Sequence, residues 1–162
     1  MMRISKFILP GLLLVFTSVY SFGQQHKPVK PKPAVITKFR APKVKTFLGT
    51  YSDTVLIDVE GAKAILAQPL TITDNNKVSY AISSYHFLYK RRIAAEDEQT
   101  GKTTPSTSIV AEVFKVTPLT DIWLNTIRDE LIKGEELFFF DIVVRDAKGH
   151  LFFAPNLKII TR

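Results

Sequence analysis

The segment Val78–Arg92 constrains the fold most, because it is the longest stretch with the residue alternation of a β-strand. Apolar residues from Val78 to Ile82 alternate with small or polar ones, and after Ser84 the alternation continues in the opposite phase. A β-bulge near Ser83 explains this change, since one extra residue turns the following side chains to the other face. We therefore expect a long, bulged strand as the centre of a sheet.

Shorter runs of β-branched and aromatic residues, separated by turn residues, follow from Thr46 to the end of the chain. The predicted strands are Phe47–Tyr51, Thr54–Val59, Leu70–Thr73, Ile109–Val116, Glu136–Arg145, His150–Ala154 and Leu157–Thr161. The run Glu136–Arg145 is apolar on both faces except at Asp141, which is typical of a central strand. The polar segment Ala94–Ser108, which contains Gly101 and Pro105, is predicted to be a hairpin loop.

One helix is predicted, capped by Thr117 or Thr120, ending at Lys133 and followed by Gly134 at the C′ position. The apolar side chains on one side of this helix are Trp123, Leu124, Ile127 and Leu131. The segment Glu60–Gln68 fits either a short helical turn or a loop. Together the elements predict an all-β domain over residues 46–162, an Ig-like β-sandwich with one short helix.

The N-terminal residues 1–23 have the layout of a secretory signal peptide. Arg3 and Lys6 precede the apolar stretch Phe7–Tyr20, and the cleavage site is expected between Gly23 and Gln24. The alternative is an uncleaved membrane anchor, but 14 helical residues span only about 21 Å of a hydrocarbon core about 30 Å thick. We expect export to the periplasm or the exterior of a bacterial cell.

Residues 24–45 are predicted to be an extended linker, because they contain four prolines, seven basic residues and no acidic residue. The linker could be a solvated spacer, or it could contact an anionic membrane surface or peptidoglycan. From Thr46 onward there are 13 basic and 15 acidic residues. The predicted domain is therefore mildly acidic despite the net charge of +7 of the whole chain, which argues against nucleic acid as a partner.

The sequence contains few residues or motifs that are typical of a catalytic, metal or cofactor site. The chain has no cysteine, which excludes disulfides, thiolate metal sites and a thiol nucleophile. The acidic run Glu96–Glu98 lacks the alternating oxygen ligands of a calcium loop and is predicted to be a solvated hairpin tip. No serine lies in a nucleophile elbow and no glycine-rich loop is present. We predict no catalytic residue, no metal site, no cofactor and no enzymatic activity.

Asp141 is the one carboxylate within an apolar strand. Buried there, it would need a structural partner such as Arg145, Arg128 or a turn amide, or it would be an acid with a shifted pKa facing a cleft. An enzyme would require polar side chains that converge in an open cleft. Two of the three residues Asp141, His86 and His150 within hydrogen-bonding distance in such a cleft would favour an enzyme.

The C-terminal third of the sequence combines several features in a fixed order. They are a capped short helix before Leu131, the stop Lys133-Gly134-Glu135, the strand Glu136–Ile142 and the turn Arg145–Gly149. In these features the sequence resembles the C-terminal domains of the gliding-motility protein GldM. Ser84–Arg92 also looks like the long strand of that family. The resemblance extends over residues 43–162 and is firmest over 120–158. The turn Asp146–Gly149 lacks a proline that the family often has there.

This resemblance implies a periplasmic β-sandwich of Bacteroidetes-type bacteria that acts in gliding motility and type IX secretion. It implies binding of envelope proteins, often as a homodimer, and no catalysis. The present chain has a predicted signal peptide and one predicted domain in place of the membrane helix and several domains of GldM, so an accessory envelope role is expected. The alternative is a small secreted ligand-binding or hydrolytic β-sandwich protein whose site is built from loops.

Overall fold

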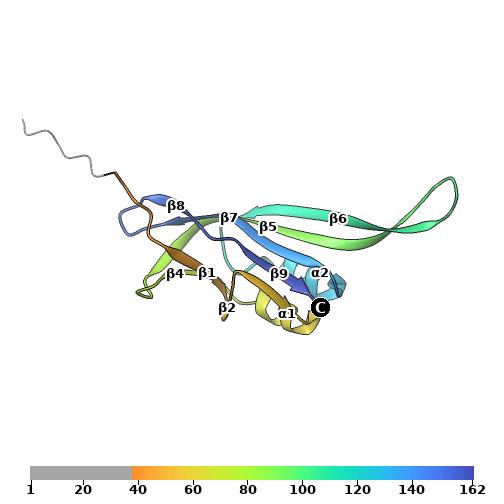
Figure 1. Cartoon of the computed structure of the whole chain (residues 1–162), viewed down its shortest axis with the longest axis horizontal. Coiled ribbons are helices and arrows are strands. Elements are labelled where there is room, and N and C mark those ends of the chain that lie inside the picture. Colours follow the sequence, from red (N-terminus) through yellow and green to blue (C-terminus); the bar gives the residue numbers. More distant parts are fainter. Residues whose placement is uncertain (1–37) are drawn as a thin grey trace, which may run out of the picture. The chain divides into compact units, whose positions relative to one another are not determined.

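The long strand predicted from the alternation is present, and the other elements are arranged around it (Figure 1). The computed structural model describes residues 38–162; the predicted signal peptide, its cleavage site at Gly23 and Gln24, and the linker up to residue 37 lie outside these residues. The described residues form nine strands and two helices. In chain order these are β1 (Val44–Leu48), β2 (Tyr51–Ser52), β3 (Thr54–Ile57), α1 (Val59–Leu66), β4 (Leu70–Asp74), β5 (Ser79–Glu96), β6 (Thr103–Phe114), α2 (Asp121–Glu130), β7 (Glu136–Arg145), β8 (Leu151–Ala154) and β9 (Leu157–Thr161).

Strand β5 organises the sheet because three strands pair with it. One edge of β5 pairs with β7, and the other edge pairs first with β4 at Ser79 and Tyr80 and then, from Tyr85 onward, with β6. The register with β7 shifts between Ile82 and Ser84 and again between Ser84 and His86, so the predicted bulge is confirmed.

The all-β class is confirmed, whereas a sandwich of two separate sheets is not. The strands form one continuous hydrogen-bonded path in the order β2-β1-β4-β5-β7-β9-β3, with β6 and β8 beside it. Its two end strands, β2 and β3, are joined through Asp53 alone, so the sheet nearly closes on itself.

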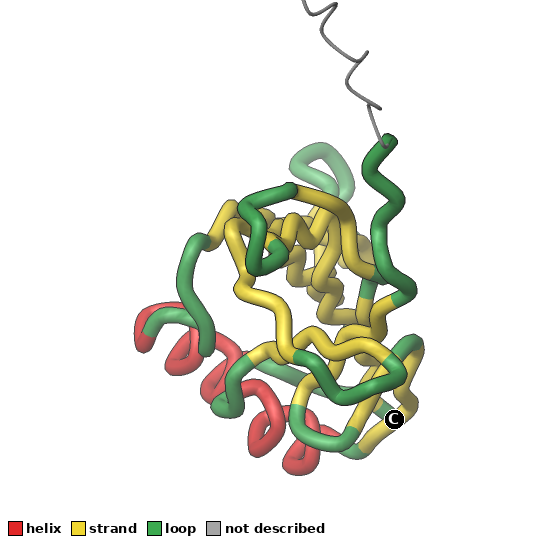
Figure 2. The backbone as a smooth tube through the Cα atoms, turned by 90° about the vertical axis from the view of Figure 1, so that its left-hand side faces the viewer, coloured by secondary structure: helices red, strands yellow, loops and turns green. Residues whose placement is uncertain are grey.

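The core lies inside this curled sheet and is closed on one side by both helices (Figure 2). Alternating residues of the strands point inward, which buries Phe87, Phe139 and Ile159 almost completely. Helix α2 contributes Ile127, which is 1% exposed, and α1 contributes Ala62. Neither helix within residues 38–162 has the length and apolar composition to span a membrane.

Two predictions about the helices need correction. The segment left open between helix and loop is helix α1, and Asp58 caps it because its carboxylate accepts a 2.8 Å hydrogen bond from the Gly61 amide. Helix α2 ends at Glu130 rather than Lys133, so Gly134 lies in the following turn, where its φ of +85° favours glycine.

The predicted loop and the first predicted strand are also different. Ala94–Ser108 is mostly strand, because β5 continues to Glu96 and β6 begins at Thr103. The predicted strand Phe47–Tyr51 is interrupted by a turn at Gly49, which has a φ of +59°. Strand β1 begins at Val44, inside the segment predicted to be linker.

The distal part of the β5–β6 hairpin has no other strand beside it. Pairing of β5 with β7 ends at Lys90, whereas its pairing with β6 continues to Glu96. The two strands therefore project past the sheet as a two-stranded ribbon (Figure 1).

Candidate functional site

One face of the sheet, called the outer face below, carries exposed apolar side chains. Residues directly opposite each other on paired strands point to the same side, so the pairing of β5 with β6 and β7 identifies these rows. The opposite side carries the core and both helices. The apolar residues of the outer face include Leu56, Leu88, Ile109, Val113, Phe138, Phe140 and Phe153.

The exposure of the outer face is large for apolar side chains. Phe153 is 70% exposed, Ile109 61% and Leu56 60%. At the centre, the rings of Phe138 and Phe140 stack with centroids 5.3 Å apart and an interplanar angle of 10°. Exposed apolar side chains gathered on one face of a sheet are typical of a protein-interaction site.

A charged cluster interrupts the outer face in the row next to Phe138. The Glu136 carboxylate lies 2.7 Å from the Lys158 ammonium and 3.3 Å from the Lys90 ammonium. The hydrogen bond from Lys158 is the main cause that lowers the pKa of Glu136. The cluster therefore keeps one negative and two positive charges beside the aromatic pair at neutral pH.

Asp141 is not buried, which corrects the prediction from its apolar strand. It has a φ of +48° beside the register shift, and its side chain is 61% exposed. Its carboxylate lies 3.3 Å from Nδ1 of His86 rather than near Arg145 or Arg128. The His86 ring also packs on Phe140, with centroids 5.0 Å apart.

His86 and Asp141 thus meet the distance part of the criterion for an enzyme, but they do not meet it in a cleft. Both side chains lie on the outer face, and the contact lacks the geometry of a hydrogen bond. His150 is elsewhere: its Nδ1 lies 2.8 Å from Asp146 and its ring stacks on Phe39 at 4.4 Å. The hydrogen bond from His150 lowers the pKa of Asp146.

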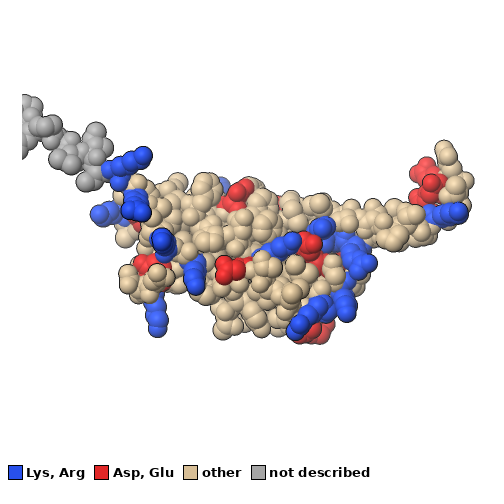
Figure 3. All heavy atoms as spheres, in the orientation of Figure 1, with Lys and Arg blue, Asp and Glu red and all other residues tan. Residues whose placement is uncertain are grey.

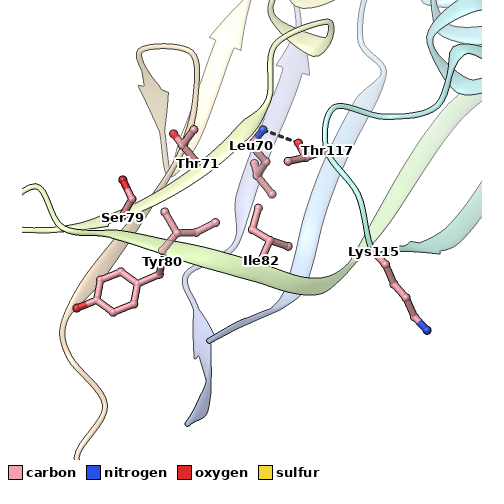
Figure 4. A pocket seen from close by; sticks show the side chains of 8 residues that line it. Leu70, Thr71, Ser79, Tyr80, Ile82, Lys115 and Thr117 are labelled. Carbon is pink, nitrogen blue, oxygen red and sulfur yellow. Dashed lines mark hydrogen bonds between the residues drawn. The ribbon is translucent and has the colours of Figure 1, made fainter. Parts of the chain in front are cut away.

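A hollow of about 250 Å³ lies where β4 and β6 leave β5 unpaired between them (Figure 4). Its polar groups include the hydroxyls of Thr71, Ser79 and Thr117. The Thr117 hydroxyl accepts a 2.7 Å hydrogen bond from the Leu70 amide at the start of β4. It therefore does not cap α2, whose N-cap residue is Thr120. In Figure 4 the Lys115 ammonium points away from these hydroxyls. The lining has no carboxylate or imidazole, so it offers no acid–base pair.

Glu135 is a buried carboxylate that sequence reasoning did not single out. It is 2% exposed and accepts hydrogen bonds from the Tyr89 hydroxyl, the Arg92 amide at 2.8 Å and the Ile132 amide at 3.1 Å. The buried Thr161 hydroxyl accepts a 2.9 Å bond from the Glu135 amide. This junction ties the segment after α2 to β5 and β9, so its role is structural.

The acidic run Glu96–Glu98 at the hairpin tip stabilises the turn in which it lies. The Asp97 carboxylate accepts 2.9 Å hydrogen bonds from the amides of Gln99 and Thr100, which lowers the pKa of Asp97. Within residues 38–162, no three histidine or acidic side chains gather in a way that could hold a metal ion. Glu96, Asp97 and Glu98 are all exposed at this tip.

Sequence reasoning did not predict the outer face. Each of its strands shows the alternation, but the alternation does not say which side a helix will cover. The exposed position of Leu56 opposite Ile160 follows only from the parallel pairing of β3 with β9.

Comparison of the whole chain with protein-family models and with curated proteins gives no match. The resemblance to GldM therefore stays a prediction from the residues quoted above.

Proposed function

We propose that this protein is an exported, non-enzymatic interaction module of the cell envelope that binds a partner protein through the outer face of its sheet. The observation that carries the proposal is the exposed apolar surface around the stacked Phe138 and Phe140. The Glu136–Lys90–Lys158 cluster beside it supplies fixed charges that can select a partner. The predicted signal peptide supports a location in the periplasm or outside the cell.

The resemblance to GldM extends the proposal to an accessory role in gliding motility or type IX secretion. An Ig-like sandwich is the finer description of the fold within this proposal. It is supported by the short pairing between β4 and β5, which involves only Ile72 and Thr73 of β4 and leaves β1, β2 and β4 almost as a separate layer. The partner is an envelope protein, and a second copy of the chain is one candidate.

The alternative function is a small secreted ligand-binding or hydrolytic protein, and the contact between His86 and Asp141 is the observation that favours it. A hydrolase also needs a nucleophile or an activated water held in a water-poor site. The exposed position of Asp141 makes the interaction module the better-supported proposal.

The experiment that tests the proposal compares cross-linked partners of the mature protein in envelope fractions. The variant Leu56→Asp/Phe153→Asp places two charges on the outer face, and the control Val78→Asp changes an apolar residue that is 51% exposed in the turn before β5. We expect a specific partner with the wild type and the control, and its loss with the double variant. Equal recovery by all three proteins, or no partner with the wild type, would contradict the proposal.

A further inference from the structure

Strand β6 has a free edge along its whole length in the described structure. Its twelve residues pair only with β5. Between Ser106 and Phe114 this edge has no proline and no lysine, which are the residues that commonly protect an edge strand from added strands. The single charge in this stretch is Glu112. In Figure 3 the shaft of the hairpin is largely free of charge, whereas its tip carries both signs. The edge is therefore suited to pair with another extended chain.

Beside this strand lies a second hollow of about 220 Å³, called the β6–α2 groove below. It is formed by the inner side of the hairpin and by α2, and its lining residues are Tyr89, Arg91, Val110, Ile122, Trp123 and Thr126. Val110 is 41% exposed and Ile122 is 78% exposed. Trp123 is held in place because its Nε1 donates a 2.5 Å hydrogen bond to the Glu112 carboxylate, and its ring meets Phe87 edge-on. The groove thus offers an apolar side chain a preformed site.

The two charged groups nearest the groove differ in their pairing. Arg91 is neutralised by Glu130, with 2.9 Å between the guanidinium and the carboxylate. Glu112, whose carboxylate accepts the hydrogen bond from Trp123, forms no ion pair with any other residue of the range 38–162. Its negative charge therefore favours a basic group on whatever binds there.

We propose that the β6–α2 groove binds an extended segment of a partner protein by strand addition. The segment pairs with the free edge of β6, inserts an apolar side chain between Val110, Ile122 and Trp123, and places a lysine or arginine beside Glu112. Backbone hydrogen bonds supply affinity in this mode, and the side-chain pocket supplies specificity. The inference rests on the proposed function, because it names a second contact by which an interaction module recognises its partner.

Trp123 makes the groove directly observable, because it is the only tryptophan of the chain. The probes are capped eight-residue peptides of alternating threonine and apolar residues with a lysine at each end. The central apolar residue is valine, leucine, isoleucine, methionine or phenylalanine. We expect at least one peptide to change the Trp123 fluorescence of the mature protein in a saturable way. N-methylation of alternate peptide amides should weaken binding about tenfold or more, because it blocks strand pairing.

Two variants distinguish peptide binding in the groove from nonspecific binding to exposed apolar residues. Ile122→Asp should weaken peptide binding about tenfold or more, whereas Ile132→Asp, an isoleucine that is 52% exposed outside the groove, should bind like the wild type. Both sites are exposed, and thermal melting checks that both variants fold. Glu112→Gln keeps an acceptor for the Trp123 indole but removes the charge. It should weaken binding of the lysine peptides and leave matched glutamine peptides unaffected.

The proposal is overturned if no peptide binds saturably at millimolar concentration, or if binding is indifferent to N-methylation or to Ile122→Asp. It is also overturned if sedimentation shows a dimer of the wild type that Ile122→Asp abolishes, because the groove is then an interface between two copies. Loss of envelope partners with Leu56→Asp/Phe153→Asp, combined with no peptide binding, rejects strand addition alone. Absence of both effects rejects the proposed function as well.

Discussion

Glu135 and Asp141 lie close together in sequence, but the structure gives the two carboxylates opposite environments. Glu135 immediately precedes β7, is 2% exposed and accepts hydrogen bonds from Tyr89, Arg92 and Ile132. Asp141 lies within β7 among apolar residues, yet its side chain is 61% exposed and contacts His86. The carboxylate that sequence reasoning did not single out is buried, and the one predicted to be buried is exposed.

The difference shows what permits a buried carboxylate. A buried charge is tolerated where several donors converge on it, and at Glu135 these donors come from β5 and from the segment after α2. Asp141 has no such set of donors, and a φ of +48° at the register shift takes it out of the regular alternation of the strand. Burial therefore follows the local backbone geometry and not the average hydropathy of the segment.

The largest effect is expected from Glu135→Ala. This substitution leaves the Tyr89 hydroxyl and the two backbone amides without their acceptor inside the fold, so the free energy of unfolding should fall by about 3–5 kcal/mol. Urea denaturation followed by circular dichroism measures the change. Asp141→Ala is the matched control and should cost far less; equal losses in the two variants would show that the two carboxylates do not differ in burial and hydrogen bonding.

The next effect is a loss of stability at alkaline pH, because β5 carries two buried tyrosines, Tyr85 and Tyr89. Burial raises the pKa of Tyr85 to about 12, and burial together with the bond to Glu135 raises the pKa of Tyr89 as well. A raised tyrosine pKa gives stability that is present below pH 10 and is lost as the pH rises toward the folded value. Tyr85 alone should account for roughly 2–3 kcal/mol of loss between pH 10 and 12.

Urea denaturation across this pH range measures the loss, and absorbance of the tyrosinate ion reports the ionisation. Glu135→Gln should lower the pKa of Tyr89 because it removes a neighbouring negative charge. Asp141→Asn should leave the tyrosine titration as in the wild type. Stability that stays constant from pH 9 to pH 12 would show that these hydroxyls are not buried.

The smallest effect is expected at Asp141 itself. Asp141→Gly should be more stable than Asp141→Ala by about 1 kcal/mol, because glycine adopts a positive φ without the clash of a Cβ atom. Thermal denaturation of the two variants, measured side by side, provides the test. An alanine variant at least as stable as the glycine variant would show that residue 141 has an ordinary strand conformation.

Much of the secondary structure could be predicted because it depends on local patterns. The alternation in Val78–Arg92 identified β5 and its bulge, and the apolar run from Glu136 to Arg145 identified β7 with its bounds. The sequence did not decide between helix and loop for the segment that forms α1. Asp58 is a good cap residue, but the segment that follows it is short. The two strands of the hairpin were predicted to be too short, because polar residues and Pro105 are typical of a loop. Strand β6 is an edge strand, which tolerates both.

The candidate sites could be predicted much less well. The outer face depends on strands that are far apart in sequence, such as β3 and β9, and on the side of the sheet to which the helices pack. The β6–α2 groove depends on where Trp123 meets Glu112. No periodicity within one segment carries this information, because each contact is set by the pairing and packing of the whole sheet.

By itself, the sequence determined the all-β class and the position of the long bulged strand, because backbone alternation and turn residues act over a few neighbouring positions. Only the tertiary structure decided that the sheet nearly closes, that Glu135 is buried and Asp141 exposed, and that β6 keeps a free edge. These features arise when segments distant along the chain meet. The energy of each such contact depends on the residues that the fold brings together, and a local sequence pattern does not identify those residues.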